Sequence, residues 1–229
     1  MDYGLRDKTI VITGAFGVLG RATAEFASQH GARVAMLDIK TAPQTITEPA
    51  LAIAVDLADP TAAGRAMNAV RAQTGSIDAL LNIAGGFAWE SFAETGSIET
   101  WERMFAINVR TVLAATKAAL PHLIDSRGAV VNIGAAGAVQ AGAGMGAYAA
   151  SKQGVMKFTE SLADELKGRV RVNAVLPSII DTERNRADMP DADPSKWVHP
   201  SELAQAMLFL ASGEASAITG ALVPVMGRV

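Results

Sequence analysis

Short apolar runs, rich in β-branched residues, alternate along the chain with longer segments of helical periodicity. Strands are expected at 9–13, 33–37, 51–55, 79–84, 129–133, 170–176 and 221–225. Helices are expected at 18–30, 60–74, about 98–124, 147–167 and 201–211. Several strand runs are apolar almost throughout, as in parallel strands that are covered on both faces. The order predicts one α/β domain over residues 1–229, with helices on both faces of a doubly wound parallel sheet.

The longest irregular stretch is 177–200, which is rich in proline, aspartate and arginine. A loop of this length inside a compact domain usually has a function, often as a lid over a site. We therefore expect residues 177–200 to cover a substrate.

Composition excludes several classes of protein. Half of the residues are hydrophobic and 19% are charged, which is typical of a globular domain with a large core. The chain has no cysteine, so disulfides, thiolate metal sites and thiol nucleophiles are excluded and a reducing compartment is compatible. The net charge of −3 and the absence of a basic run argue against nucleic acid as a partner. No basic-then-apolar leader opens the sequence, and we expect a cytoplasmic location.

Residues 128–151 carry no charge and are long enough to cross a bilayer. Glycine and alanine dominate them, however, and Leu, Ile and Phe, which drive insertion, are scarce. We interpret this stretch as a buried strand and a flexible loop, and expect no membrane association.

A glycine-rich turn lies between the first expected strand and the first expected helix. Gly14, Gly17 and Gly20 stand three residues apart in Thr13-Gly14-Ala15-Phe16-Gly17-Val18-Leu19-Gly20. Glycines at such spacing let the backbone turn tightly and approach a pyrophosphate, which the helix N-terminus then binds. The setting predicts a dinucleotide site of the Rossmann type.

Acidic and polar residues end the following strands. Asp38 is placed to accept hydrogen bonds from both hydroxyls of an adenosine ribose, and its charge would repel a 2′-phosphate, so NAD(H) is favoured. Lys40 could soften that preference, and NADP(H) is not excluded. The alternative for Asp38 is a solvated charge at a strand end. Asp56 is expected to flank the adenine, and Asn82 to contact the cofactor where the strand order reverses.

Tyr148 and Lys152 lie four residues apart on an expected helix, so their side chains share a face. A phenol donates a proton usefully when its pKa falls toward the working pH, and a neighbouring ammonium lowers that pKa. The pair predicts a proton donor to a carbonyl or imine.

Together these motifs make the chain resemble the short-chain dehydrogenase/reductase family from end to end. They are the glycine-rich turn, Asn82-Ile83-Ala84-Gly85, Asn108-Val109, Tyr148-x-x-x-Lys152 and Asn173-Ala174-Val175-Leu176-Pro177. The resemblance implies that Tyr148 donates the proton, that Lys152 lowers its pKa and binds the nicotinamide ribose, and that Asn108 holds a water. It also implies cofactor contacts at Gly14, Phe16, Gly17, Val18, Leu19, Gly20, Asp38, Asp56, Leu57, Asn82, Ala84, Gly85, Tyr148, Lys152, Pro177, Ile179 and Thr182.

Two departures from the family pattern point to one branch. Val18 occupies a position that is usually glycine, and Ala135 replaces the serine that orients the substrate oxygen. Dihydropteridine reductases share both features and resemble the loop at Pro177, Asp181-Thr182, Asn185-Arg186, Met189-Pro190, Ala192-Asp193 and Trp197. The resemblance implies NADH-dependent reduction of a quinonoid dihydropterin, an electron-poor imine that can dispense with the serine.

Alternatives remain for the substrate and for the activity itself. A carbonyl reductase with a similar loop would look the same, and Ala135 also suits a non-catalytic NAD(H)-binding sensor. Phe87, Trp89 and Trp197 are candidate substrate contacts beside Ala135, although packing is an equal alternative for both tryptophans. The family resemblance further implies a homo-oligomer, a tetramer or a dimer, built from helices 98–124 and 147–167.

Overall fold

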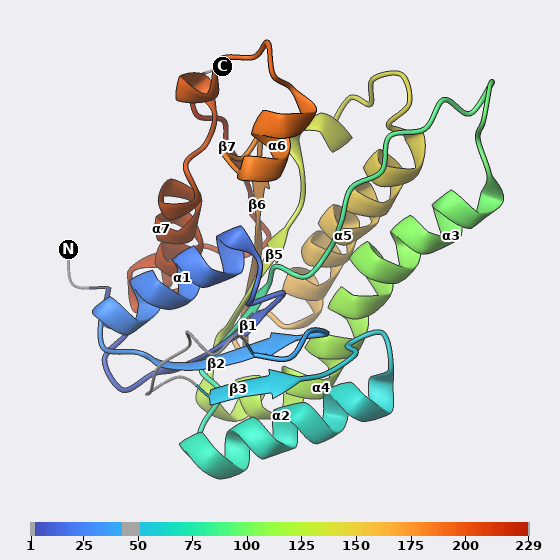
Figure 1. Ribbon diagram of the computed structural model, residues 1–229. Helices are drawn as coiled ribbons and strands as arrows, with labels where there is room; N and C mark the ends of the chain where they lie inside the picture. The colour runs from blue at the N-terminus through green and yellow to red at the C-terminus, as the bar shows by residue number, and fades with distance from the viewer. Residues whose placement is uncertain (1–2, 43–50, 229) are drawn as a thin grey trace.

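One parallel sheet organises the molecule. The computed structural model describes residues 3–42 and 51–228 (Figure 1). Its seven strands lie in the order β3-β2-β1-β4-β5-β6-β7. Their bounds are β1 Thr9–Thr13, β2 Arg33–Asp38, β3 Leu51–Ala54, β4 Ala79–Asn82, β5 Ala129–Ile133, β6 Arg171–Pro177 and β7 Leu222–Val225. The strand order reverses between β3 and β4, so a ligand crevice is expected at the carboxyl ends of β1 and β4.

Helices cover both faces of the sheet, as Figure 1 shows. Their bounds are α1 Val18–Gln29, α2 Pro60–Thr74, α3 Ile98–Phe105, α4 Thr111–Ser126, α5 Gly146–Glu165, α6 Glu183–Asp188 and α7 Pro200–Ala211. Helices α1 and α7 pack on one face, and α2, α4 and α5 pack on the other. This arrangement confirms the predicted doubly wound Rossmann fold.

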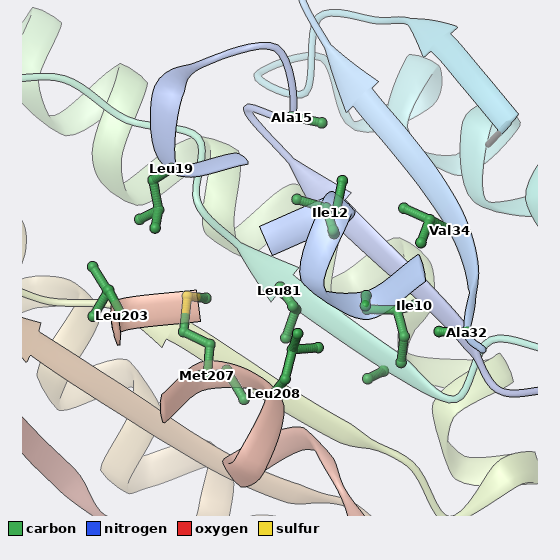
Figure 2. Close-up of a cluster of buried hydrophobic side chains, with 14 of the residues drawn as sticks. Ile10, Ile12, Ala15, Leu19, Ala32, Val34, Leu81, Leu203, Met207 and Leu208 are labelled. Atoms are coloured by element: carbon green, nitrogen blue, oxygen red, sulfur yellow. The ribbon is translucent and has the colours of Figure 1, made fainter. Parts of the chain in front are cut away.

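The two cores follow from the alternation of side chains along each strand. Ile10 and Ile12 of β1 point to the α1–α7 side, and Val11 between them points to the α2–α4–α5 side. Figure 2 shows the first core, in which residues of β1 and β4 face Leu203 and Met207 of α7. Because the central strands contribute side chains to both cores, several of them are apolar almost throughout, as predicted.

The expected helix 98–124 is divided. A π-helical segment, Ala106–Arg110, separates α3 from α4 and contains Asn108. Such widened turns are rare and often occur at functional sites. Hydrophobic periodicity does not reveal an insertion of this kind, because the helix continues on either side of it.

The segment 177–200 contains structure that the sequence did not predict. Helix α6 starts where the Thr182 side chain accepts a hydrogen bond from the Asn185 amide at 3.1 Å, and a 3-10 turn follows at Pro194–Lys196. Both elements are short and polar, so neither produces a periodic signal.

Residues 128–151 divide into β5, a loop and the start of α5, close to the expected strand and loop. Among the described residues, no helix is long and apolar enough to cross a membrane.

Candidate active site

The glycine-rich turn joins β1 to α1 and lies against the segment after β4. Gly14 has a φ of +62°, and a Cβ there would lie 2.8 Å from the Ala84 Cα. A Cβ on Gly20 would lie 2.4 Å from the Gly14 carbonyl oxygen. The Thr13 hydroxyl, whose role the sequence did not reveal, accepts hydrogen bonds from the amides of Ile83 and Ala84 at 3.0 and 3.1 Å. Gly14 and the Thr13 hydroxyl thus hold the β1 turn against the segment after β4, and Gly20 lets α1 pack closely on the turn.

The amino end of α1 is open for an anion. Its N-cap is Gly17, which has no side chain, and its first turn has no acidic residue. The first-turn amides therefore lack the carboxylate or hydroxyl that often caps a helix, and they can bind phosphate. Phe16 and Leu19 are buried in the core, whereas Val18 is exposed. The Phe16 carbonyl accepts a hydrogen bond from the Arg21 guanidinium at 2.7 Å.

Asp38 lies at the end of β2 beside this turn. Its Oδ2 accepts a hydrogen bond from the Phe16 amide at 2.9 Å, and its Oδ1 accepts one from the Lys40 amide at 3.1 Å. A carboxylate has about four acceptor sites, so two remain for ribose hydroxyls. Asp56 is exposed and accepts a hydrogen bond from the Ala58 amide, whereas Leu57 is buried. The turn, the open helix end and Asp38 together fit a dinucleotide.

Asn82 does not face this crevice. Its Nδ2 donates to the Thr116 hydroxyl at 3.0 Å and to Asn132 Oδ1 at 2.9 Å, and Asn132 donates in turn to Thr159. The side chain is buried, and in the described part of the chain its Oδ1 has no partner. This side chain links β4 to β5 and α4, and the cofactor contact at Asn82 stays a prediction.

The predicted catalytic residues meet at the carboxyl ends of β4 and β5. Lys152 is buried and donates from Nζ to the Ile133 carbonyl at 3.0 Å. A Cβ on Gly85 would lie 2.6 Å from Asn108 Oδ1 and 3.4 Å from Lys152 Nζ. The Tyr148 ring contacts Phe87 edge-on, with 4.9 Å between ring centroids. The structure therefore brings Tyr148, Lys152, Asn108 and Gly85 together.

Asn108 is fixed by hydrogen bonds on both sides of its amide. Its Oδ1 accepts from the Gly86 amide at 2.8 Å, and its Nδ2 donates to the Gly86 carbonyl at 3.1 Å and to the Ser151 hydroxyl at 2.9 Å. Ser151 donates to the Tyr148 carbonyl at 2.7 Å. Nothing in one sequence marks this serine as a link between the two residues. A water held by Asn108 stays a prediction.

Ala135 lies in a small apolar cluster beside Tyr148. It is 4% exposed and packs with Ala138, Met156 and Leu176. A methyl group has no hydrogen-bond donor, so this side of the site offers a substrate oxygen only apolar contact.

Burial shifts both catalytic pKa values. It raises the pKa of the Tyr148 phenol to about 12 and lowers the pKa of the Lys152 ammonium to about 8. The expectation that Lys152 lowers the pKa of Tyr148 is not met in this structure, because burial of the phenol dominates and the ammonium hydrogen-bonds to Ile133.

Replacing Lys152 with methionine tests this burial through stability. The folded-state pKa of about 8 lies below the unfolded value of 10.5, so between these pH values the unfolded chain binds more protons than the folded one. The wild-type free energy of unfolding should therefore rise relative to that of Lys152→Met by about 3 kcal/mol across this window. Urea unfolding at pH 7.5, 9 and 10.5 measures the difference. Parallel pH dependence of the two proteins would contradict the shift.

The segment 177–200 is closed at its base. Ile180 and Val198 form a β-bridge, and the Asp181 amide donates to the Val198 carbonyl at 2.8 Å. Trp197 is 4% exposed, which favours the packing alternative over substrate contact. Pro177 is buried, whereas the two expected carboxamide contacts, Ile179 and Thr182, are half-buried. Phe87 and Trp89, 52% and 62% exposed, stand on the segment after β4.

A cavity of about 570 Å³ lies elsewhere, at the amino ends of the strands. The carboxyl ends of α4 and α7 reach it, and Arg171 there donates to the carbonyls of residues 210, 211, 212 and 215 at 2.6–3.1 Å. Cations favour helix carboxyl ends, which explains this arginine without a ligand. The cavity contains none of the catalytic residues.

Comparison with known proteins gives a consistent family. Residues 8–193 match the family described as short chain dehydrogenase. Meso-2,3-butanediol dehydrogenase of Serratia marcescens is 35% identical over 96% of this chain and 94% of its own length. A 3-oxoacyl-(acyl-carrier-protein) reductase of Thermotoga maritima is 32% identical over 97% of this chain and 98% of its own length.

Solved structures agree with these relatives. Ligand-free aldohexose dehydrogenase of Thermoplasma acidophilum superposes with a TM-score of 0.91 at 31% identity, covering 100% of this chain and 96% of its own. The 3-ketoacyl-(acyl-carrier-protein) reductase of Brucella melitensis, in complex with NADH, has a TM-score of 0.86 at 29% identity, covering 98% and 99%.

Proposed function

Because this chain belongs to the short chain dehydrogenase family, we propose that it is an NADH-dependent reductase of a C=N or C=O group with Tyr148 as proton donor. The observation that carries the proposal is the convergence of Tyr148, Lys152 and Asn108 beside an open helix end and Asp38. A binding protein without catalysis would not need the first three residues.

Each group of residues at the site has its own role in the proposed reaction. NADH bound by the glycine-rich turn and Asp38 would supply the hydride that reduces the C=N or C=O group. Tyr148 retains its proton at neutral pH, since its pKa is about 12, and gives it to the substrate nitrogen or oxygen. Asp38 binds the ribose and disfavours the 2′-phosphate of NADPH. The segment 177–200 covers the substrate as a lid.

The finer proposal is that the substrate is a quinonoid dihydropterin. Ala135 supports it, because a conjugated imine accepts hydride without a donor at that position, whereas a ketone gains from one. The second candidate is a small carbonyl compound, which the similarity to a butanediol dehydrogenase favours. We further propose a cytoplasmic homo-oligomer in which Phe105 and Leu113, each 41% exposed, contribute to the contact.

A substrate panel tests the proposal. NADH oxidation is followed with a quinonoid dihydropterin, with diacetyl, and with simple aldehydes and imines, each repeated with NADPH. We expect the dihydropterin to be reduced, and NADH to be preferred over NADPH. Turnover of the carbonyl compounds alone would support the reductase activity and contradict the dihydropterin as its substrate. If no substrate is turned over but fluorescence titration shows that NADH binds, the result would favour a non-catalytic NAD(H)-binding sensor.

Replacing Ala135 with serine should raise kcat/KM for diacetyl about two- to tenfold, the worth of one hydrogen bond to the carbonyl oxygen. Ala138→Ser is the matched control, because Ala138 is equally buried in the same cluster. Equal effects of the two variants would show that position 135 does not face the reacting oxygen.

A further inference from the structure

The chain that leads into the catalytic helix has little local structure of its own. Residues 141–146 read Ala-Gly-Ala-Gly-Met-Gly, and the N-cap of α5, Met145, makes no side-chain capping bond. Tyr148 lies in the first turn of this helix. The phenol position therefore depends on whatever holds residues 141–146 from outside.

Trp89 holds the middle of this stretch, and Trp101 lies against its last residue, Gly146. The Trp89 Nε1 donates to the Ala143 carbonyl at 3.0 Å. Its indole lies on the bare Cα of Gly144, where a Cβ would be 2.3 Å from Trp89 Cε2. Beside it, the Glu90 amide donates to the Gly144 carbonyl at 2.9 Å. Gly144, at a φ of +75°, thus accommodates both the turn and the indole.

The segment that carries Trp89 is itself anchored at the site. Three residues before Trp89, Gly86 exchanges two hydrogen bonds with the Asn108 side chain. Between them, the Phe87 ring rests edge-on against Tyr148. Segment 86–90 therefore spans from Asn108 to the start of α5, and Trp89 closes its far end.

We propose that Trp89 is a positioning residue for the reaction: its indole latches segment 86–90 to Ala143 and Gly144 and so fixes the catalytic phenol of Tyr148 relative to Asn108. This role is a packing role, one of the two alternatives that the sequence left open for Trp89, and it rests on the proposed reductase function. Misplacing a catalytic group by about 1 Å can cost roughly a hundredfold in rate, so a latch of this kind has a measurable effect.

Kinetics of two variants test the latch. Trp89→Ala should lower kcat about ten- to a hundredfold with NADH affinity unchanged. Trp89→Phe keeps a ring on Gly144 but loses the N–H, and it should recover part of kcat. Phe92→Leu is the control, because Phe92 is 65% exposed on the same loop and its ring packs edge-on against Trp101. An effect of Trp89→Ala on KM alone would overturn the latch in favour of substrate contact.

A double-mutant cycle tests whether Trp89 acts through its contact with Gly144. Gly144→Ala alone drives its methyl into the indole, but in the Trp89→Ala background only the positive φ remains costly. Gly144→Ala should therefore lower kcat and the unfolding midpoint much less in that background. Additive effects would mean that the two residues do not act together.

Hydrogen exchange separates failure of the latch from failure of the proposed function. Amides at 147–150 should exchange about tenfold faster in Trp89→Ala and unchanged in Phe92→Leu. If wild type reduces no substrate but this difference is found, the function fails and the latch holds. If wild type is active and exchange and kcat are unchanged in Trp89→Ala, the latch is wrong.

Discussion

Replacing Tyr148 with phenylalanine should lower kcat about a hundred- to ten-thousandfold and leave NADH affinity unchanged. The substitution removes one oxygen and keeps the ring that packs against Phe87 at 4.9 Å. Among the described residues, the phenol hydroxyl has no protein partner, so no hydrogen bond of the fold is lost. The variant therefore isolates proton donation, measured by steady-state kinetics and NADH fluorescence titration.

The other tyrosine of the chain is the control. Tyr3 packs against Phe26 and His30 in the core formed with α1, away from the catalytic residues, and Tyr3→Phe should leave kcat unchanged. If Tyr148→Phe retained full turnover, another group would donate the proton and the assigned role would be wrong. If it lost NADH affinity together with turnover, the residue would serve binding instead.

Replacing Gly20 with alanine should reduce the free energy of unfolding by about 3 kcal/mol or more. The new methyl would lie 2.4 Å from the Gly14 carbonyl oxygen and 2.6 Å from the Ala15 Cα. Both neighbours are backbone atoms of the turn that follows β1, so they cannot move aside as a side chain would. Urea unfolding measures the loss, and failure to fold cooperatively is its extreme form.

Gly64 provides the matched substitution. It lies inside α2, and a Cβ there would meet no atom within 4 Å. Gly64→Ala should raise the free energy of unfolding by about 0.5–1 kcal/mol, because alanine is the better helix former. Equal free energies of unfolding for Gly20→Ala and Gly64→Ala would contradict the close packing assigned to Gly20.

Local patterns predicted the features that depend on local sequence. The apolar runs predicted the strands, and the spacing of Tyr148 and Lys152 predicted that both would face one site. Contacts between distant residues gave no such signal. Asn82 pairs with Thr116 and Asn132, 34 and 50 residues away, so these contacts could not be deduced from its place at the end of β4. The raised pKa of Tyr148 likewise follows from packing around the phenol.

The latch between Trp89 and Gly144 shows the same limit. A tryptophan followed much later by a glycine carries no signal in a sequence, which left substrate contact and packing as equal alternatives for Trp89. Only the fold brings the two residues into contact, because the loops after β4 and β5 leave neighbouring strands at the same edge of the sheet.

The closed base of segment 177–200 makes that segment an exchangeable module. Its two ends are joined by the bridge between Ile180 and Val198, so the 17 residues between them start and finish at almost the same point. Doubling the length of such a loop costs only about 0.6 kcal/mol in closure entropy. Residues 182–196 can therefore be exchanged for a longer or shorter insert while the sheet, the glycine-rich turn and helix α5 stay as they are, which makes this segment the place to vary the proposed substrate contacts.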